Sequence, residues 1–143
     1  AEVRGVRFIL SFGVVKLWEL AGFMKRVYAC GSLRFADKIT ELETRLEKEN
    51  IECVASKSKD AGGILGCLEK IDNADVVYVV NPEGYVGKSV CLDIGYAYAK
   101  NKLIFVMCSV DDPPLMRLID GTLSFEEVIS FLKKEAAFSA QGD

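Results

Sequence analysis

Residues 75–97 read DVVYVVNPEGYVGKSVCLDIGYA, and this stretch decides the fold. It begins with an apolar, β-branched run up to Val80, which is typical of a central parallel strand buried on both faces. A loop with two glycines follows, and from Ser89 the pattern predicts a helix to Lys100. An open α/β sheet builds small-molecule sites from this order of strand, glycine loop and helix start, at the carboxyl ends of its strands.

Strands and helices alternate along the rest of the chain in the same way. The other predicted strands span residues 27–30, 51–55 and 103–108, with a short fifth strand expected near 117–123. Such alternation predicts a parallel sheet with right-handed crossovers. The sequence therefore predicts an α/β fold that is flavodoxin-like, with three α/β/α layers and a parallel sheet of four to five strands in the order 2-1-3-4(-5).

Helical spacing predicts which residues pack on this sheet. A helix over 35–50 is expected to turn inward Phe35, Ile39, Leu42 and Leu46. A helix over 61–73 is expected to turn inward Ile64, Leu65, Leu68 and Ile71. The two prolines at 113–114 can open a short helix, and a capping box at 124–127 predicts a last helix to about Lys134.

The length and composition fit one domain. With 143 residues, half of them hydrophobic, the chain can bury a modest core. Its net charge of -3 offers no electrostatic footprint for a nucleic acid polymer. We expect the domain to cover residues 24–134, followed by a frayed tail at 135–143.

Residues 1–23 differ from the rest in composition. Arg4 and Arg7 precede an apolar run at 8–15, which Lys16 interrupts. The run is too short to span a bilayer, so no membrane contact is expected, and it resembles a weak signal peptide without a small-x-small cleavage site. We expect an appendage outside the core fold; the alternative is an accessory helix that packs on the domain or on a partner.

Cysteine and histidine usage limits the chemistry. The five cysteines, at 30, 53, 67, 91 and 108, form no C-x-x-C pair, and the chain has no histidine. A zinc site and a disulfide framework are therefore both disfavoured, and free thiols in a reducing, cytoplasmic compartment are favoured. Without an imidazole base, acid–base or nucleophilic catalysis falls to carboxylates, tyrosine, lysine or cysteine.

Two glycine loops are expected to open into one crevice, because the strands before them flank the point where the strand order reverses. The first offers close backbone approach, a hydroxyl and a guanidinium, which suit a phosphate or carboxylate, through Gly31, Ser32 and Arg34. In the second, Gly84 and Gly87 free the backbone, Tyr85 can cover a base or sugar, and Ser89 is expected to cap the helix. The alternative for each is a plain connection from strand to helix.

Asp93 is the one carboxylate in the first turns of the helix that follows the second loop. An acidic residue there can simply face solvent and suit the helix dipole. Its apolar neighbours Leu92, Ile94 and Ala97 instead favour partial burial, which would raise the pKa of the Asp93 carboxyl.

Together these motifs resemble the nucleoside 2-deoxyribosyltransferase-like family over roughly residues 24–134. The matching segments are YACGSLR at 28–34, IDNADVVYVVNP at 71–82, GYVGKS at 84–89 and DIGYA at 93–97. The family includes nucleoside deoxyribosyltransferases and nucleotide N-glycoside hydrolases. The resemblance implies a flavodoxin-like fold, a reaction that needs no metal or organic cofactor, and a homodimer whose sites border the neighbouring subunit.

The resemblance also implies a role for each site residue. Asp93 takes the position of the catalytic nucleophile, where the family has a glutamate, and Tyr28 is the aromatic residue near the sugar. Two turns before Asp75, where relatives often carry an acid or a histidine, this chain has Cys67. The first ligand loop, which would favour a 5′-phosphate, comprises Gly31, Ser32 and Arg34. The second ligand loop comprises Gly84, Tyr85, Gly87 and Ser89.

Different classes of function stay open at this point. One is an enzyme, a nucleoside 2-deoxyribosyltransferase or a nucleoside 5′-monophosphate N-glycosidase, that cleaves or transfers an N-glycosidic bond. The second is a non-catalytic nucleotide-binding module of the same fold. Both take a small nucleoside or nucleotide as ligand. A structural or interaction role that involves residues 1–23 is the third.

Overall fold

A five-stranded parallel sheet forms the centre of the computed structural model, which describes residues 26–56 and 63–141. Its order is β2-β1-β3-β4-β5, and each neighbouring pair is parallel, which confirms the predicted fold class and strand order. The appendage predicted at residues 1–23 lies outside the described residues. The strands are β1 Arg26–Gly31, β2 Glu52–Ala55, β3 Val76–Val80, β4 Leu103–Val106 and β5 Gly121–Thr122.

Helices connect the strands close to the predicted positions. Short 3-10 turns follow β1 and β3, η1 at Leu33–Phe35 and η2 at Pro82–Gly84. The α-helices are α3 Ala36–Lys48, α4 Gly63–Asp72, α5 Lys88–Ala99, α6 Pro113–Met116 and α7 Phe125–Gln141. The backbone of α7 stays helical past the expected end at Lys134.

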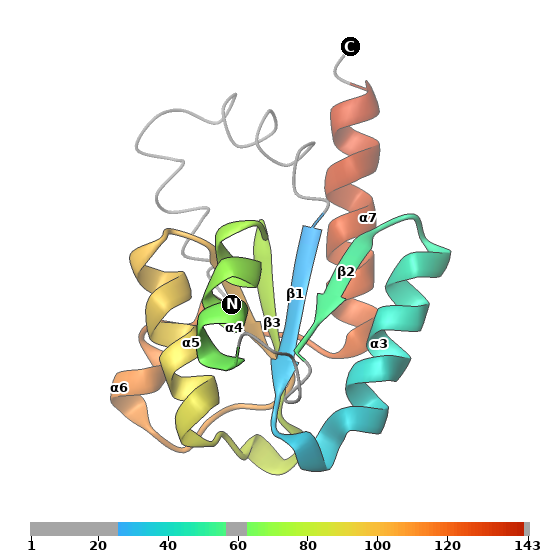
Figure 1. The fold of residues 1–143 in the computed structure, drawn as a ribbon. Helices are drawn as coiled ribbons and strands as arrows, with labels where there is room; N and C mark the ends of the chain where they lie inside the picture. The colour runs from blue at the N-terminus through green and yellow to red at the C-terminus, as the bar shows by residue number, and fades with distance from the viewer. Residues whose placement is uncertain (1–25, 57–62, 142–143) are drawn as a thin grey trace.

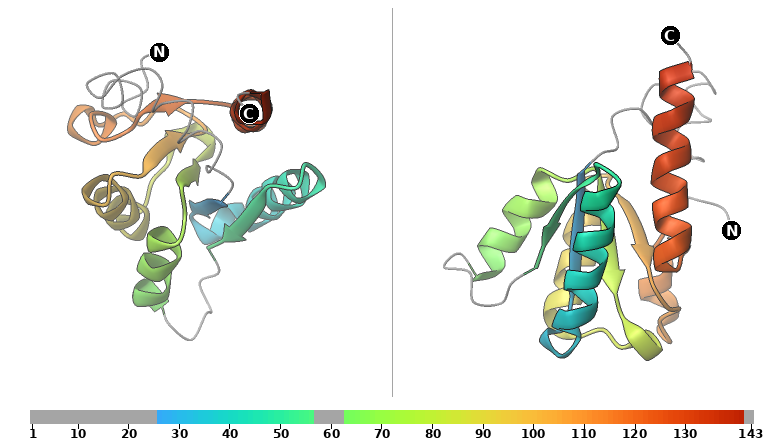
Figure 2. Two further views of the ribbon diagram at one scale, coloured as in Figure 1. Left: turned by 90° about the horizontal axis from the view of Figure 1, so that it is seen from above. Right: turned by 90° about the vertical axis from the view of Figure 1, so that its right-hand side faces the viewer.

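The helices cover both faces of the sheet and so make three layers (Figures 1 and 2). On one face α3 and α7 pack against the sheet, and their buried residues include Leu42, Leu46, Val128 and Leu132. On the other face α4 and α5 lie side by side, and their buried residues include Ile71, Ile94 and Ala97. The central strands β1 and β3 are buried on both sides, as their apolar sequences predict.

The predicted inner face of α4 is only half correct. Ile71 is fully buried and Leu68 packs against the core, but Ile64 and Leu65 do not turn inward. Leu65 is 73% exposed, and Ile64 lines a cavity beyond the sheet. The first turn of α4 therefore faces the cavity and solvent, where helical spacing alone predicts core packing.

The helix starts differ in how they are capped. At α7 the predicted capping box is present: the Glu127 N–H donates to the Ser124 hydroxyl at 3.1 Å, and the Ser124 N–H donates to the Glu127 carboxylate at 3.1 Å. At α5 the expectation that Ser89 caps the helix is wrong. The helix begins one residue earlier, because the extended Gly87 is the N-cap and its carbonyl accepts from the Cys91 N–H.

The described helices also bear on membrane association. Across residues 26–56 and 63–141, none of them combines the length and the apolar character that crossing a bilayer requires.

Candidate functional site

The two predicted ligand loops leave the sheet side by side. β1 and β3 are paired in parallel, and their last partners are Gly31 and Val80. A Cβ at position 31 would lie 2.6 Å from the Val80 carbonyl oxygen, closer than real side chains come. Glycine is therefore required here by the close approach of the two backbones, and it brings the loop after β1 against the loop after β3.

The second loop is fastened to the end of β4. The buried Asn81 side chain donates to the Cys108 carbonyl at 2.7 Å and accepts from the Cys108 N–H at 2.9 Å. Gly84 adopts a left-handed φ of +81°, and a Cβ there would lie 2.5 Å from the Ser109 carbonyl oxygen. These contacts fix the course of the loop before it reaches α5.

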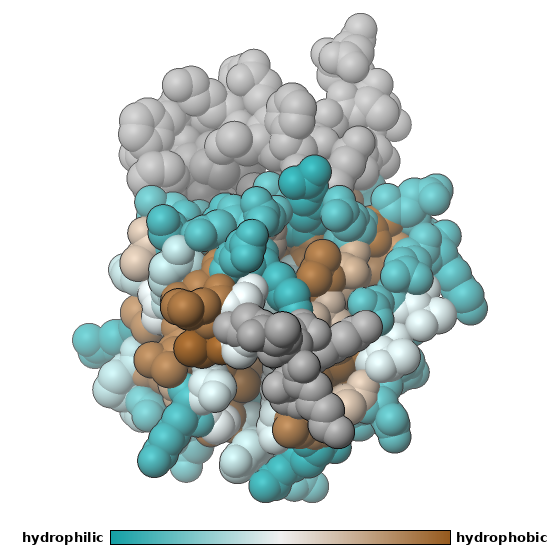
Figure 3. Space-filling view, viewed as in Figure 1, coloured by the Kyte–Doolittle hydropathy of each residue, from teal (hydrophilic) through white to brown (hydrophobic). Residues whose placement is uncertain are grey.

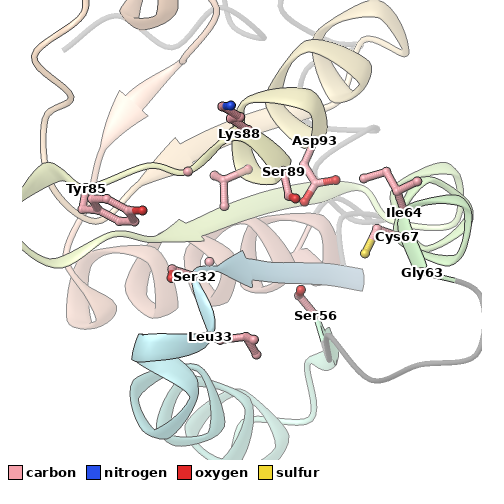
Figure 4. Close-up of a pocket in the computed structure, with 13 residues that line it drawn as sticks. Ser32, Leu33, Ser56, Gly63, Ile64, Cys67, Tyr85, Lys88, Ser89 and Asp93 are labelled. Carbon is pink, nitrogen blue, oxygen red and sulfur yellow. The ribbon is translucent and has the colours of Figure 1, made fainter.

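A cavity of about 580 Å³ opens between the two loops and α4 (Figure 4). Six of the nine predicted site residues line it, namely Gly31, Ser32, Tyr85, Gly87, Ser89 and Asp93. The cavity lies at the carboxyl ends of β1, β2 and β3, where an open α/β sheet commonly binds its ligands.

The other three predicted residues lie around the cavity without lining it. The Arg34 guanidinium lies over the Tyr85 ring at 4.2 Å from its centroid, so it stacks across the two loops. Gly84 shapes the turn that leads to Tyr85. Tyr28 is fully buried on β1 and reaches the site through its hydroxyl.

Asp93 is the buried charge of the site. Its side chain comes from α5 and the residue is only 3% exposed. The Tyr28 hydroxyl donates to Oδ2 at 3.4 Å, while Oδ1 has no hydrogen-bond partner among the described residues. Burial raises the pKa of the Asp93 carboxyl to about 6, and the Tyr28 hydrogen bond opposes that rise.

Tyr28 joins several polar groups around that carboxylate. Burial raises the Tyr28 pKa above its usual range; the nearby Cys30 and Asp93 and a hydrogen bond with the Cys67 side chain add to the rise. A hydrogen bond with the Ser56 side chain acts in the opposite direction. The Tyr28 hydroxyl therefore stays protonated and can donate to the carboxylate.

Some lining residues were not expected from the sequence. Leu33, Ser56, Gly63, Ile64, Lys88 and Val90 line the cavity, and Cys67 does so from α4. Ser56 follows β2, so the predicted strand order could have placed it beside the first loop. Lys88 stands at the first position of α5, although its side chain points away from the other labelled side chains (Figure 4).

The groups around the cavity suit an anion better than a metal ion. Within the described ranges, no three carboxylate or thiol side chains group as they would to hold a metal ion. The first turn of α5, by contrast, lines the cavity together with Ser32 and Ser89, and the first backbone N–H groups of a helix have no partner within the helix. Such a helix start binds anions.

Comparison with known proteins identifies similar folds. No known protein family matches the sequence, and no curated protein sequence matches it either. Its fold is similar to the Vibrio vulnificus NanR protein complexed with ManNAc-6P, with a TM-score of 0.55 and 14% identity over 89% of this chain and 52% of that chain. The chain thus spans about half the length of that protein.

Two further solved structures match nearly over their whole length. One is a conserved protein from Enterococcus faecalis V583, with a TM-score of 0.54 and 18% identity over 78% of this chain and 98% of that chain. The other is the Clostridium botulinum CMP N-glycosidase BcmB, with a TM-score of 0.53 and 17% identity over 77% of this chain and 99% of that chain. At these identities the likeness shows a shared fold alone.

Proposed function

We propose that this protein cleaves the N-glycosidic bond of a nucleoside or a nucleoside 5′-monophosphate, with Asp93 as the attacking carboxylate. One observation carries the proposal: Asp93 is buried in the cavity with Oδ1 lacking a hydrogen-bond partner among the described residues. An unsatisfied buried acceptor costs about 1–3 kcal/mol, and more when it is charged. Use of Oδ1 as the nucleophile would explain why the protein keeps a buried carboxylate despite this cost.

The chemistry follows the logic of a carboxylate nucleophile. Asp93 Oδ1 forms a bond to the anomeric carbon while the bond from that carbon to the base nitrogen breaks, and the base leaves with the electron pair. Water then releases the sugar, or a second base accepts it. Tyr28 holds Oδ2, which leaves Oδ1 as the oxygen for the attack.

The first turn of α5 supports a 5′-phosphate on the substrate. Its N–H groups and the hydroxyls of Ser32 and Ser89 can donate to phosphate oxygens. Two of the similar structures have related ligands, since one is a CMP N-glycosidase and the other holds ManNAc-6P. A nucleoside 5′-monophosphate is therefore the favoured substrate, and ribose or deoxyribose transfer is the variant in which a base replaces water.

The direct test is release of free base from a panel of nucleosides and their 5′-monophosphates, followed by chromatography. We expect base release from at least one monophosphate, and its loss in Asp93→Ala. Asp111→Ala, which removes an exposed carboxylate in the loop after β4, is the matched control and should retain the rate. Base release that survives Asp93→Ala would contradict the assigned role.

A second candidate function is ligand binding without turnover. An aspartate side chain is shorter than the family's glutamate by one methylene, about 1.5 Å of reach. Misplacement by about 1 Å can cost on the order of 100-fold in rate. Thermal stabilisation by a nucleotide without any free base, together with base release gained in Asp93→Glu, would favour this candidate.

We also infer that the chain forms a homodimer in a reducing, cytoplasmic compartment. Leu65 of α4 and Leu92 of α5 are exposed, and an apolar patch is visible on the face of the molecule that carries these helices (Figure 3). All five cysteines are free thiols. Light scattering tests the assembly, since a dimer mass is expected, and Leu65→Glu should shift it toward the monomer.

A further inference from the structure

The five cysteines differ in how deeply they are buried and in whether they line the cavity. Cys30 and Cys53 are buried in the two cores, and burial raises the pKa of each thiol, that of Cys53 to about 12. Cys91 and Cys108 are partly buried and do not line the cavity. Cys67 is partly buried as well, but it lines the cavity, and its sulfur is directed into it (Figure 4).

A second observation indicates that ligands enter the same cavity. Asp93 lines this cavity from α5 and is only 3% exposed. Its Oδ1 has no hydrogen-bond partner among the described residues. Tyr28 links the two groups, because its hydroxyl donates to Asp93 and is hydrogen bonded with the Cys67 side chain. The thiol therefore stands beside the group that a ligand would meet.

We propose that Cys67 is a covalent modification site for small, uncharged, electron-poor alkenes that enter the cavity. The sulfur electron pair forms a carbon–sulfur bond to one alkene carbon. The π electrons move to the other carbon, which takes up the proton that the thiol releases. The step is a net addition, so it needs no oxidant and expels no leaving group. Uncharged reagents are favoured because the Asp93 carboxylate repels an anionic group placed directly beside the sulfur, away from the start of α5 where the phosphate is proposed to bind.

The proposal goes beyond the proposed function because it requires no turnover. The cavity of about 580 Å³ has room for a compact ring attached to the thiol. The adduct would stand between α4 and α5, next to Tyr28 and Asp93, and so exclude other ligands. Reactive alkenes would then control access to the site through a residue that takes no part in the proposed bond cleavage.

The experiment treats the folded, full-length protein with one equivalent of N-ethylmaleimide at pH 8, quenches it over time and maps the adducts by peptide mass spectrometry. Since a reagent that enters the cavity meets the Cys67 sulfur, and neither Cys91 nor Cys108 lines that cavity, we expect Cys67 to be labelled at least about fivefold faster than those two. Cys30 and Cys53 should react only after denaturation. Labelling of Cys91 or Cys108 ahead of Cys67 overturns the proposal.

A pair of variants tests the position of the thiol. Cys67→Ser should remove the fast adduct and leave the slower ones unchanged. Asp93→Asn removes a negative charge close to the negative charge that passes from the sulfur to the alkene carbon during the addition, so it should speed labelling of Cys67 severalfold and leave Cys91 unaffected. An unchanged Cys67 rate in folded Asp93→Asn, checked by circular dichroism, also overturns the proposal, because the two groups would then not share one enclosed space.

Discussion

Two tyrosines on neighbouring central strands are both fully buried, yet they serve opposite faces of the sheet. Tyr78 on β3 faces α3 and α7, and its hydroxyl donates to the Leu123 carbonyl at 2.7 Å. Tyr28 on β1 faces α4 and α5, and its hydroxyl donates to Asp93 at 3.4 Å. The first bond is short and fastens backbone, while the second is long and leads to a carboxylate in a cavity.

The contrast extends to the helices on each face. The α3 and α7 side is apolar and closed, with Leu42 and Leu132 almost without exposure. The α4 and α5 side carries the cavity, a buried carboxylate and exposed leucines. One face of the sheet therefore stabilises the fold by apolar packing, and the other holds a buried carboxylate that, under the proposed function, a ligand would meet.

The largest effect on stability is expected from matched leucines of α3 and α4. Leu42→Ala opens a cavity in the closed face and should lower the free energy of unfolding by about 3 kcal/mol. Leu65→Ala removes a side chain that is 73% exposed and should change it by less than about 0.5 kcal/mol. Urea denaturation at concentrations where the chain is monomeric measures both, and equal costs would break the contrast between the faces.

Asp93→Asn should stabilise the protein as it removes the proposed activity. The native carboxyl has its pKa raised from 3.8 to about 6, so between these values the folded chain holds a proton that the unfolded chain has lost. Wild-type stability therefore falls as pH rises through this interval and stays low above it. The variant should gain up to about 3 kcal/mol at pH 8 and less than about 1 kcal/mol at pH 4.

Denaturation curves at the two pH values measure this gain. The exposed Asp111→Asn is the control and should change the free energy of unfolding by less than about 0.5 kcal/mol. If Asp93→Asn is no more stable than the wild type at pH 8, the buried carboxylate costs little free energy of unfolding. The two faces of the sheet would then not differ in their contribution to stability.

The two tyrosines themselves give the next effect. Tyr78→Phe leaves the Leu123 carbonyl without its donor and should cost about 1–2 kcal/mol of stability. Tyr28→Phe should cost less, because its bond is long, but it removes a contact that lowers the Asp93 pKa. NMR titration of ¹³C-labelled aspartate should then show the Asp93 pKa moving upward in Tyr28→Phe and staying in place in Tyr78→Phe.

The smallest effect is expected at two helix starts. Ser124→Ala removes the N-cap of α7 on the closed face and should cost about 1 kcal/mol. Ser89→Ala lies inside the first turn of α5, where Gly87 is the N-cap, and should cost less than about 0.5 kcal/mol. Thermal denaturation compares the two; a larger cost for Ser89→Ala would indicate a structural role for that hydroxyl.

The sequence predicts the closed face better than the open one. Strand order follows from the alternation of β-branched runs with amphipathic helices, and Ile39, Leu42 and Leu46 point inward as their spacing predicts. The α7 cap could be predicted because both partners lie within four residues of one another. Local patterns suffice where the environment is uniformly apolar.

The open face depends on contacts between distant segments, which local patterns do not contain. Helical spacing cannot tell that Ile64 meets a cavity instead of the sheet. Arg34 stacks on Tyr85, which lies 51 positions further along the chain. This stacking competes with the anion contact that the sequence predicts for Arg34. Ser56 forms a hydrogen bond that lowers the Tyr28 pKa. The two residues meet because β2 and β1 are neighbours in the sheet.

The side chain of Asn81 has a consequence for how a ligand is bound. Its two hydrogen bonds with Cys108 continue the ladder between β3 and β4 past the end of both strands. The loop between β3 and α5, whose Tyr85 and Gly87 form one wall of the cavity, is thus held in place without a ligand. If the proposed function holds, a ligand need not repay the conformational entropy of arranging that wall, and more of its contact energy becomes affinity.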